Sequence, residues 1–446
     1  MARRRPIKRD PRQTAIGIVR RLREAGHEAW WVGGCVRNRL LGLEPKDYDI
    51  ATSARPPQIQ RLFPRSDLVG AHFGVVLVVA GGRHFEVATF RRDGRYLDRR
   101  RPRSVSFGSL HDDARRRDFT INALYYDPLE DRLLDPVGGL RDLRARRLRC
   151  IGDPFERFAE DALRLLRAIR FAVRFGLAIE RATWAALRAC APLIADISPE
   201  RIRDELVAML TGPRPGQALR RLSSSGLLRV IVPEVEAMKG VEQPPEFHPE
   251  GDVFTHTCRT LDALDAPSPT LAMAALLHDV GKPPAFRRAE DRIRFDRHES
   301  LGADIAAAVC RRLRFPRRQI ETIVARVARH MGFMNLMEMR PSTLKRFMAD
   351  PGFDEDLALH RADCLASHGD ASGAEYCERK RAEFVRAAGA IVPPPLITGD
   401  DLIAMGYAPG PRFGKMLRAV ADAQMEGALR TPAQARDWIR AHFVAP

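Results

Sequence analysis

The feature that most constrains the fold of this chain is a change of pattern near residue 150. Up to that point, short apolar strands alternate with helical segments, whereas from Pro154 onward apolar residues recur every three to four positions, as in helices. The chain has 446 residues, which is too many for one ordinary hydrophobic core. We therefore predict an α+β, mostly helical protein in which a small mixed α/β head precedes helical domains.

The expected elements of the head follow from local patterns and turn residues. The sequence predicts helices over 14–26, 34–42 and 56–63, and strands over about 27–32, 47–51, 74–80 and 84–90. Gly81 and Gly82 separate the last two strands, which predicts a hairpin. Prolines at 244, 245, 249 and 393–395 mark linkers. The expected domains are a head over 1–150, a helical neck over 151–243, a helical body over 244–375 and a helical tail over 376–446.

The net charge of +17 is the strongest compositional clue to a partner. Such an excess of basic residues favours a polyanion, and nucleic acid more than a membrane surface, because no long basic amphipathic segment stands out. No apolar run approaches the ~20 residues that span a bilayer, so no membrane partner is expected. The seven cysteines are scattered without a CxxC pair, which argues against a disulfide framework and fits a cytoplasmic protein.

Asp47 and Asp49 are the most informative side chains of the head. Residues two apart in a strand lie on the same face, so both carboxylates are expected to converge while Tyr48 points to the other face. Two hard oxygen ligands with room for water and phosphates suit Mg²⁺. A pair of such ions can clamp an in-line displacement at phosphorus. The pattern therefore predicts the metal-binding half of a nucleotidyl-transfer site.

Glycines and an arginine precede this acidic pair. Gly33-Gly34 is expected to start a helix, where the missing side chain of Gly34 lets a phosphate approach the backbone N–H groups. Arg37 follows one turn later, and Glu86 on a later strand is a candidate third carboxylate. A glycine pair alone is more often a plain turn, and Glu86 alone is more often half of a structural ion pair. The combination favours phosphate binding.

Several segments resemble, in family order, the motifs of the class II tRNA nucleotidyltransferase and bacterial poly(A) polymerase superfamily. They are WWVGGCVRNRLLGLEPKDYDIATSARP at 30–56, RRRDFTINALYYDP at 115–128, DPVGGLRDLRARRLRCIGDP at 135–154, EDALRLLRAIRFAVRFG at 160–176 and ERIRDEL at 200–206. The last segment, LITGDDLIAMGYAPGPRFGKML at 396–417, resembles the tail of CCA-adding enzymes. One departure is Asn38, where the family usually has Asp, which puts the local ion pair of that position in doubt.

The resemblance implies roles for the residues of the head. Asp47 and Asp49 would bind Mg²⁺, and Gly34, Arg37 and Arg117 would hold the incoming triphosphate. One metal ion would lower the pKa of the RNA 3′-hydroxyl, and the other would neutralise charge on the leaving pyrophosphate. Positioning and electrostatics would then supply most of the acceleration.

The segment 160–176, expected to be one helix, carries the argument for nucleotide choice. Asp161 and Arg164 would lie on one side of a helix, where such a pair is ordinarily a weak surface salt bridge. If the pair faces a base, Asp161 accepts a hydrogen bond and Arg164 donates one. Cytosine and adenine offer the matching amine donor and ring-nitrogen acceptor. Uracil and guanine offer a carbonyl and a ring N–H instead, which would set acceptor against acceptor and donor against donor. The resemblance assigns base reading to Asp161 and Arg164, with Arg167 and Arg170 beside them, and implies CTP and ATP as substrates.

The arginine-rich stretch from Arg91 to Asp118 contains RRDGRYLDRRRPRSVSF. It resembles the flexible loop of enzymes that are able to add the terminal A. The alternative interpretation is a basic loop that binds RNA phosphates, and both can hold. These residues do not separate a full CCA-adding enzyme from an A-adding enzyme or a poly(A) polymerase.

A second set of metal-binding residue types lies in the body, around AALLHDVGKP at 274–283. Their order and rough spacing resemble the HD metal-dependent phosphohydrolase superfamily. The set comprises His256, His278, Asp279, His298, His330 and Asp363. The resemblance implies one ion on four of these residues and a second on His298 and His330, with Ni²⁺, Mn²⁺, Mg²⁺ or Fe²⁺ as candidates. Imidazole-rich ligation favours a transition metal. His248 is interpreted as a linker residue.

The resemblance and the charge together imply a cytoplasmic enzyme that adds C and A to the 3′ end of tRNA from CTP and ATP. It would hold the tRNA acceptor end by shape and phosphate contacts and carry an HD phosphohydrolase activity on RNA 3′ ends. Alternatives are an A-adding enzyme or poly(A) polymerase, an HD phosphohydrolase whose head binds RNA, and a non-enzymatic RNA-binding protein. The sequence leaves the oligomeric state open.

Overall fold

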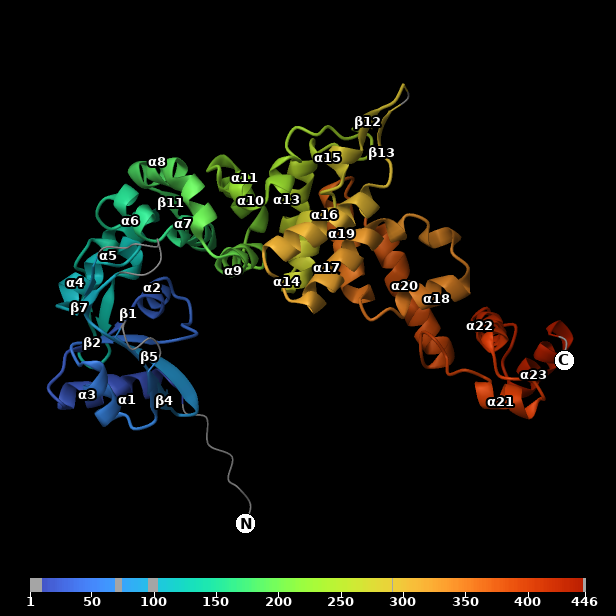
Figure 1. Cartoon of the computed structure of the whole chain (residues 1–446), viewed down its shortest axis with the longest axis horizontal. Coiled ribbons are helices and arrows are strands. Elements are labelled where there is room, and N and C mark those ends of the chain that lie inside the picture. The colour runs from blue at the N-terminus through green and yellow to red at the C-terminus, as the bar shows by residue number, and fades with distance from the viewer. Residues whose placement is uncertain (1–9, 69–73, 95–102, 291, 444–446) are drawn as a thin grey trace, which may run out of the picture. The chain divides into compact units, whose positions relative to one another are not determined.

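The computed structural model describes residues 10–68, 74–94, 103–290 and 292–443 (Figure 1). The chain divides into two compact units, Met1–Pro233 and Glu234–Pro446. The finer division expected from the sequence, with boundaries after residues 150, 243 and 375, stays a prediction.

A mixed seven-stranded sheet forms the head in the first unit, with the strand order β3-β4-β5-β2-β1-β8-β9. Strand β2 runs parallel to β5, and the other neighbours are antiparallel. The strands are β1 (Ala29–Val32), β2 (Asp49–Thr52), β3 (Ser66–Leu68), β4 (Val75–Ala80), β5 (Arg83–Thr89), β8 (Tyr125–Asp127) and β9 (Arg132–Leu134). The small mixed sheet expected from the sequence is thus confirmed.

The glycine turn of the head is also confirmed. Ala80 pairs with Arg83, so Gly81 and Gly82 form the two-residue loop between β4 and β5. Both glycines have positive φ, 57° and 75°, as a type I′ hairpin turn requires.

The start of one expected strand is wrong. The strand predicted over 47–51 begins only at Asp49, because its ladder to β1 ends with the pair Val32–Asp49. Asp47 therefore lies in the preceding loop, exposed to solvent. The argument that alternation along a strand aligns Asp47 with Asp49 does not apply.

Short helices pack on the sheet, drawn in blue in Figure 1. Helix α1 (Pro11–Glu24) buries Ala15, Ile18, Val19 and Leu22, and this spacing places them on one face. Helix α2 (Gly34–Leu40) follows β1 directly, and α3 (Pro56–Leu62) follows β2. Two further head helices are α4 (Leu110–Arg115) and α5 (Gly139–Arg144).

The strands β6 (Arg91–Asp93) and β7 (Val105–Phe107) pair antiparallel. They flank residues 95–102, which belong to the stretch that resembles an A-adding loop and lie outside the described residues. The role predicted for that stretch is therefore not described by the structure.

The rest of the first unit is helical, as the sequence predicts. Among the described helices that follow the head in this unit, α7 (Leu163–Phe175) is the longest. It buries most of its apolar side chains, among them Leu166, Ile169 and Phe171. The neighbouring elements are α6 (Pro154–Glu160), α8 (Arg181–Cys190), α9 (Pro199–Leu210), α10 (Pro215–Ser224) and α11 (Leu227–Ile231), with the short strands β10 (Arg147–Leu148) and β11 (Ala178–Ile179).

The second unit is built around α14 (Pro269–Leu277), whose residues from Leu271 to Leu277 are all buried. Ser268 caps this helix by accepting a hydrogen bond from the N–H of Leu271. Around it lie α13 (Val253–Ala263), α16 (His298–Arg312), α17 (Arg317–Arg329) and α19 (Phe353–Ala366), followed along the chain by α20 (Ser372–Ala388). The unit also contains α12 (Pro233–Glu236), α15 (Lys282–Ala285) and α18 (Pro341–Met348).

Two features of the second unit differ from or extend the sequence prediction. The strands β12 (Phe286–Arg288) and β13 (Ile293–Phe295) form a hairpin inside a block that was expected to be entirely helical. The final helices α21 (Gly399–Ala404), α22 (Pro411–Met425) and α23 (Pro432–His442) enclose a separate core that includes Leu402, Met416 and Ile439.

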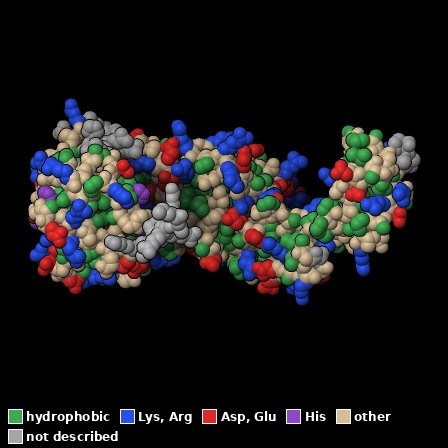
Figure 2. Space-filling view, turned by 90° about the horizontal axis from the view of Figure 1, so that it is seen from below, with side chains coloured by type: hydrophobic (Ala, Val, Ile, Leu, Met, Phe, Trp, Pro, Cys, Tyr) green, Lys and Arg blue, Asp and Glu red, His purple; other side chains and the backbone are tan. Residues whose placement is uncertain are grey.

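On the face drawn in Figure 2, Lys and Arg side chains of the described residues lie among acidic ones over both units. All seven cysteines are free and buried. Within the described ranges, the structure contains no helix with the length and apolar character needed to cross a membrane.

Candidate functional sites

The carboxylates of the head meet at the N-terminal end of β2. Asp49 is the first residue of this strand, and the parallel register that pairs Ile50 with Val87 sets Asp49 beside Glu86 on β5. Burial, followed by the charges of Glu86 and Asp47, raises the pKa of Asp49 to about 6. The charges of Glu86 and Asp47 thus act on Asp49, an environment that favours a cation. Among the described residues, however, the groups of three potential ligands that lie within 4.8 Å of one another are all in the second unit.

Gly33 lies between Asp49 and Arg117. It precedes α2 with φ 73°, and a Cβ atom placed on it would lie 3.5 Å from Arg117 Nη1 and 3.7 Å from Asp49 Oδ2. A Cβ atom on Gly34 would instead approach Arg37, at 3.7 Å from Nη2. The sequence predicted Gly34 as the position of phosphate approach, whereas in the structure it is Gly33 that faces Asp49.

Arg117 is held in place by its neighbours. Its Nη2 donates to Asp113 Oδ2 at 2.8 Å, and its Nε lies 3.3 Å from the hydroxyl oxygen of Tyr125. The Tyr125 hydroxyl in turn donates to Asp113 Oδ2 at 2.7 Å. Burial alone would lower the pKa of Arg117, but Asp113 outweighs it and raises this pKa. The guanidinium is a fixed positive charge beside Gly33.

Arg37 is 5% exposed and packs toward the neck. Its guanidinium lies over the rings of Phe171 and Phe175, at 5.0 and 4.2 Å from their centroids, and its Nη1 donates to Asn122 Oδ1. The Oδ1 of Asn38 accepts from Arg37 Nη2 at 2.9 Å. Asn38 thus keeps a hydrogen bond to Arg37 but supplies no negative charge. Burial lowers the pKa of Arg37 to about 10.

The helix expected over 160–176 is interrupted at Asp161. Helix α6 ends at Glu160, Asp161 is extended with φ −142° and ψ 101°, and α7 begins at Leu163. The Oδ1 of Asp161 accepts the N–H of Leu163 at 3.1 Å, a local contact by which Asp commonly starts a helix. The prediction that Asp161 and Arg164 share one helix face is therefore wrong.

Arg164 pairs with Glu160 rather than with Asp161. Its Nη1 donates to Glu160 Oε2 at 2.7 Å and to the carbonyl of Arg157 at 2.9 Å. Asp161 is approached by Arg201, whose Nη2 lies 3.2 Å from Oδ2. An acceptor and a set of donors still occur within this segment, but the acceptor Asp161 lies at the junction between the two helices and the donor Arg164 lies on α7.

The next two arginines of α7 also have acidic partners. Arg167 donates to Asp118 Oδ2 through Nε and Nη2, at 2.9 and 2.7 Å. Arg170 donates from Nε to Glu205 Oε2 at 2.6 Å. Both guanidinium groups lie beside the ring of Phe171, at 5.1 and 4.5 Å from its centroid. Asp118 and Glu205 were not predicted as site residues, although both lie inside segments that resemble family motifs.

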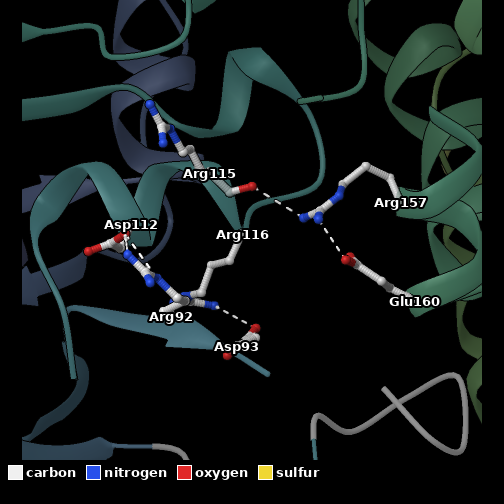
Figure 3. A pocket seen from close by; sticks show the side chains of 7 residues that line it. All are labelled: Arg92, Asp93, Asp112, Arg115, Arg116, Arg157 and Glu160. Carbon is white, nitrogen blue, oxygen red and sulfur yellow. Dashed lines mark hydrogen bonds and ion pairs between the residues drawn. The ribbon is translucent and has the colours of Figure 1, made fainter. Parts of the chain in front are cut away.

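A pocket of about 370 Å³ adjoins Glu160 (Figure 3). It is lined by Arg92, Asp93, Asp112, Arg115, Arg116, Arg157 and Glu160. Arg157 donates to Glu160 Oε1 at 2.6 Å and to the carbonyl of Arg115 at 3.2 Å, and both contacts are visible in Figure 3. The pocket is polar and rich in arginine, a lining suited to an anionic ligand.

All six residues predicted for the second metal site lie together in the second unit. Asp279 is at the centre, with its two carboxylate oxygens facing different ligands. On one side, Asp279 Oδ2 lies 3.2 Å from His278 Nε2 and 3.7 Å from His256 Nε2. Asp363 Oδ1 completes this group at 2.8 Å from His256 Nε2.

On the other side, Asp279 Oδ1 lies 3.6 Å from His298 Nε2 and 3.7 Å from His330 Nε2. These two imidazole nitrogens are 3.2 Å apart. The residues thus form two potential metal-binding groups that share Asp279. Nitrogen and carboxylate donors at such spacing fit two divalent ions bridged by one carboxylate.

Backbone carbonyls orient most of these imidazoles. The Nδ1 atoms of His278, His298 and His330 donate to carbonyl oxygens at 2.8, 2.9 and 2.7 Å. The acceptors belong to Ala275, Phe295 and Val327, respectively. Because Nδ1 carries the proton, Nε2 has a free lone pair directed into the cluster, which is the state required of a metal ligand.

Several neighbours of this cluster were missed. His256 Nδ1 lies 2.6 Å from Glu250 Oε1, which is also 3.0 Å from His248 Nδ1. The interpretation of His248 as a mere linker residue is therefore incomplete. Lys282 Nζ lies 2.8 Å from Asp279 Oδ2 and donates to Gln243 Oε1 at 2.7 Å. Lys282 follows Asp279 by three residues, a spacing that could have drawn attention to it.

Three families match successive parts of the chain. Residues 29–149 match the poly A polymerase head domain, residues 176–239 match a probable RNA and SrmB-binding site of polymerase A, and residues 253–366 match the HD domain. The head and HD families together imply dependence on divalent metal ions.

Curated relatives include both activities that the sequence left open. A poly(A) polymerase I of Haemophilus influenzae is 33% identical over 83% of this chain and 83% of its own length. A CCA-adding enzyme of Geobacillus kaustophilus is 41% identical over 57% of this chain and 64% of its own length. A second one, from Geobacillus thermodenitrificans, is 46% identical over 49% and 54%. The matched region thus spans between half and two thirds of these CCA-adding enzymes.

Solved structures of CCA-adding enzymes resemble the whole chain. The Bacillus stearothermophilus enzyme in complex with CTP has a TM-score of 0.71 at 28% identity, with 97% of this chain and 98% of that chain covered. The Thermotoga maritima enzyme complexed with tRNA has a TM-score of 0.60 at 20% identity, with 97% and 96% covered, and supports the fold.

Proposed function

Because the chain belongs to the family of CCA-adding enzymes and bacterial poly(A) polymerases, we propose that it adds C and A to the 3′ end of tRNA from CTP and ATP. The observation that supports this proposal is that Asp49 and Arg117 both face Gly33, with Glu86 beside Asp49 on the neighbouring strand. Carboxylates for a metal ion and a fixed cation for phosphate are the two elements that nucleotidyl transfer needs.

In this proposal, Asp47 and Asp49 hold Mg²⁺, and Glu86 adds a third negative charge nearby. Bound Mg²⁺ supplies activation of the 3′-hydroxyl and neutralisation of the leaving pyrophosphate. Arg117, fixed by Asp113, grips the triphosphate over Gly33, and Gly34 and Arg37 shape the start of α2. A bond forms between the RNA O3′ and the α-phosphorus, and the bond to the β-phosphate oxygen breaks to release pyrophosphate.

We assign base selection to the junction between α6 and α7. Asp161 offers a carboxylate acceptor, and Arg164 offers donors from the start of α7. Cytosine and adenine match this arrangement, whereas uracil and guanine would leave polar groups mispaired at about 1–3 kcal/mol each. Arg167 and Arg170 support α7 through Asp118 and Glu205. The arginine-lined pocket beside Glu160 is the proposed entrance for the nucleotide.

The second candidate for the same site is poly(A) addition. The Haemophilus influenzae poly(A) polymerase I is similar over a larger share of this chain than the CCA-adding enzymes above. An A-adding enzyme of a split system is a related alternative.

We further propose a phosphohydrolase activity for the cluster around Asp279, directed at RNA 3′ ends. Water would add across the bond between phosphorus and O3′ of a cyclic 2′,3′-phosphate: its hydroxyl goes to phosphorus and its proton to O3′, which frees the 3′-hydroxyl. His256, His278, Asp279, Asp363, His298 and His330 would hold the ions. The four imidazoles favour Ni²⁺, Mn²⁺ or Fe²⁺ over Mg²⁺. The rival from another class is a phosphohydrolase whose head merely binds RNA.

One assay separates these functions. The full chain is incubated with Mg²⁺, labelled CTP or ATP, and tRNA that ends either before CCA or after CC. Incorporation of both nucleotides on the first tRNA supports CCA addition. ATP incorporation on the second tRNA alone indicates an A-adding enzyme, and long A tails on arbitrary RNA indicate a poly(A) polymerase. Hydrolysis without any incorporation would favour the rival class. A cytoplasmic location is part of the proposal and agrees with seven free cysteines.

A further inference from the structure

The hairpin of β12 and β13 connects two parts of the Asp279 cluster. It follows α15, which begins at Lys282, and precedes α16, which begins at His298. Phe286 at its start pairs with Phe295 at its end. Figure 1 shows the two strands extending away from the helices of the second unit. The base of the hairpin is therefore fixed beside the metal-binding residues.

Aromatic contacts lead from the cluster to this hairpin. The ring of Phe295 lies 6.5 Å from that of His298 and 6.0 Å from that of Phe286, between centroids. Lys282 Nζ lies 5.4 Å from the centroid of Phe295. Phe286 is thus one ring farther out than Phe295, and its side chain is 38% exposed.

A second cavity opens beside Phe286. It has a volume of about 350 Å³ and is lined by Gly240, Val241, Glu242, Pro283, Phe286 and Arg288. Pro283 directly follows Lys282, which contacts Asp279. Pro283 therefore connects this cavity along the chain to the Asp279 cluster, and the exposed ring of Phe286 forms another wall.

The ion pair at this cavity, between Arg288 and Glu242, can open so that Arg288 binds a ligand. Arg288 pairs with Glu242, and their side chains are 66% and 65% exposed. Exposed ion pairs are weak because water screens them. An exposed guanidinium group beside an exposed aromatic ring is a combination that binds single-stranded nucleic acid.

We propose that this cavity binds the nucleobase of the nucleotide that precedes the 3′-terminal one in a single-stranded RNA. Phe286 stacks on the base, and Arg288 leaves Glu242 to contact a phosphate. The inference rests on the phosphohydrolase proposed for the Asp279 cluster and specifies its substrate class. The substrate is the 3′ end of a polynucleotide, because a free nucleotide has no second base to occupy the cavity.

The test compares two substrates that share the same reacting group. The full-length protein, supplied with Mn²⁺ or Ni²⁺, hydrolyses either a short RNA that ends in a 2′,3′-cyclic phosphate or a 2′,3′-cyclic mononucleotide. Replacing Phe286→Leu keeps an apolar side chain but removes the aromatic face. We expect KM for the RNA to rise about tenfold, within the range of one lost stacking contact, while the mononucleotide is hydrolysed at the wild-type rate. Phe286→Trp should keep the wild-type KM for RNA.

Control variants distinguish a loss of RNA binding at the cavity from unfolding and from a general loss of positive charge. Arg288→Ala should raise KM for the RNA, whereas Arg317→Ala, which removes a 93% exposed arginine from α17, should not. The melting temperature and the hydrolysis of the mononucleotide report whether the second unit of each variant is folded.

The outcomes distinguish failure of the base-binding inference from failure of the phosphohydrolase proposal. If the wild type hydrolyses the mononucleotide with the same kcat/KM as the RNA, or if Phe286→Leu changes KM for both substrates equally, the inference is overturned while the phosphohydrolase stands. If the wild type hydrolyses neither substrate, the proposed phosphohydrolase fails and the inference fails with it.

Discussion

Arg167 on α7 donates two hydrogen bonds to Asp118, which directly follows Arg117 in the head. The pair therefore joins the segment that carries the proposed triphosphate-binding arginine to α7, the helix that also carries the proposed base-reading residue Arg164. Asp118 is 8% exposed, and its other oxygen accepts from Asn122 Nδ2 at 2.9 Å. The geometry of the nucleotide site thus depends on a contact between two motifs that lie far apart in the sequence.

Replacing Arg167→Met should destabilise the first unit. The substitution leaves the carboxylate of Asp118 buried without its cation, which costs about 3 kcal/mol or somewhat less because Arg167 is partly exposed. Urea denaturation followed by fluorescence would measure the loss. Arg144→Met on the exposed end of α5 serves as a control and should change little. An unchanged midpoint for Arg167→Met would show that the pair contributes no stability.

Acid should destabilise the same contact. Burial would raise the pKa of Asp118, but Arg167 and Asn122 outweigh it and lower this pKa to about 2. A carboxyl group whose folded pKa lies below its unfolded value of 3.8 stabilises the protein above that value. This contribution disappears as the pH falls from about 4 to about 2. Asp118→Asn should show a shallower loss of stability over this range, measured by denaturation at successive pH values; an identical slope in both proteins would contradict the assignment.

Replacing Asp49→Ala or Asp47→Ala should abolish CTP and ATP incorporation. Metal ions supply several kcal/mol of charge stabilisation in such reactions, so a loss of about a thousandfold or more is expected. Hydrolysis at the Asp279 cluster should remain, because the two sets of ligands lie in different units. Asp67→Ala removes an exposed carboxylate from β3 and is the matched control. Simultaneous loss of both activities in Asp49→Ala would argue against independent sites.

Gly33 and Gly42 allow a sharper test of the head. Their φ angles are 73° and 71°, so alanine should strain either position by about 1–3 kcal/mol. A Cβ atom on Gly42 meets no atom within 4 Å, whereas one on Gly33 would lie between Arg117 and Asp49. Gly33→Ala should therefore lose nucleotidyl transfer, while Gly42→Ala should lose only stability. Equal activity in the two variants at a temperature where both are folded would remove Gly33 from the site.

Replacing Asp279→Asn should affect both proposed metal ions of the second unit. Asp279 faces both groups of ligands, whereas His298 belongs to only one of them. We expect Asp279→Asn to lose both ions and His298→Ala to lose one, measured by elemental analysis after dialysis. Retention of both ions by Asp279→Asn would show that the carboxylate is not shared.

The sequence predicted those parts of the fold that depend on local chemistry. Gly81 and Gly82 predicted a two-residue hairpin loop because each supplies a positive φ at no steric cost. The residues around His278-Asp279 were predicted as a cluster because their types and order have few other interpretations, and the structure brings all of them together. Their metal-binding role and that of Asp47 and Asp49 remain predictions.

The predictions that proved wrong concern places where local hydrogen bonds, short strands or packing decide the structure. Asp161 was placed inside a helix because apolar periodicity continues through this segment, but its backbone is extended and its carboxylate accepts the N–H of Leu163, so α6 ends before it and α7 begins after it. The hairpin at Phe286–Phe295 was missed because its strands have three residues each and give too short an alternation to detect. His248 was assigned to a proline-rich linker, and only tertiary packing brings Glu250 between it and His256.

Main-chain oxygens hold three of the four imidazoles around Asp279, and every residue type carries such an oxygen. Positions 275 and 327 can therefore change side chain without altering the acceptor that fixes His278 or His330. Both positions are fully buried, so small apolar replacements that fit the surrounding core should be tolerated there, whereas large or polar ones should not. The ligands themselves have no comparable freedom, so random mutagenesis should find no replacement for them and a few apolar ones at 275 and 327.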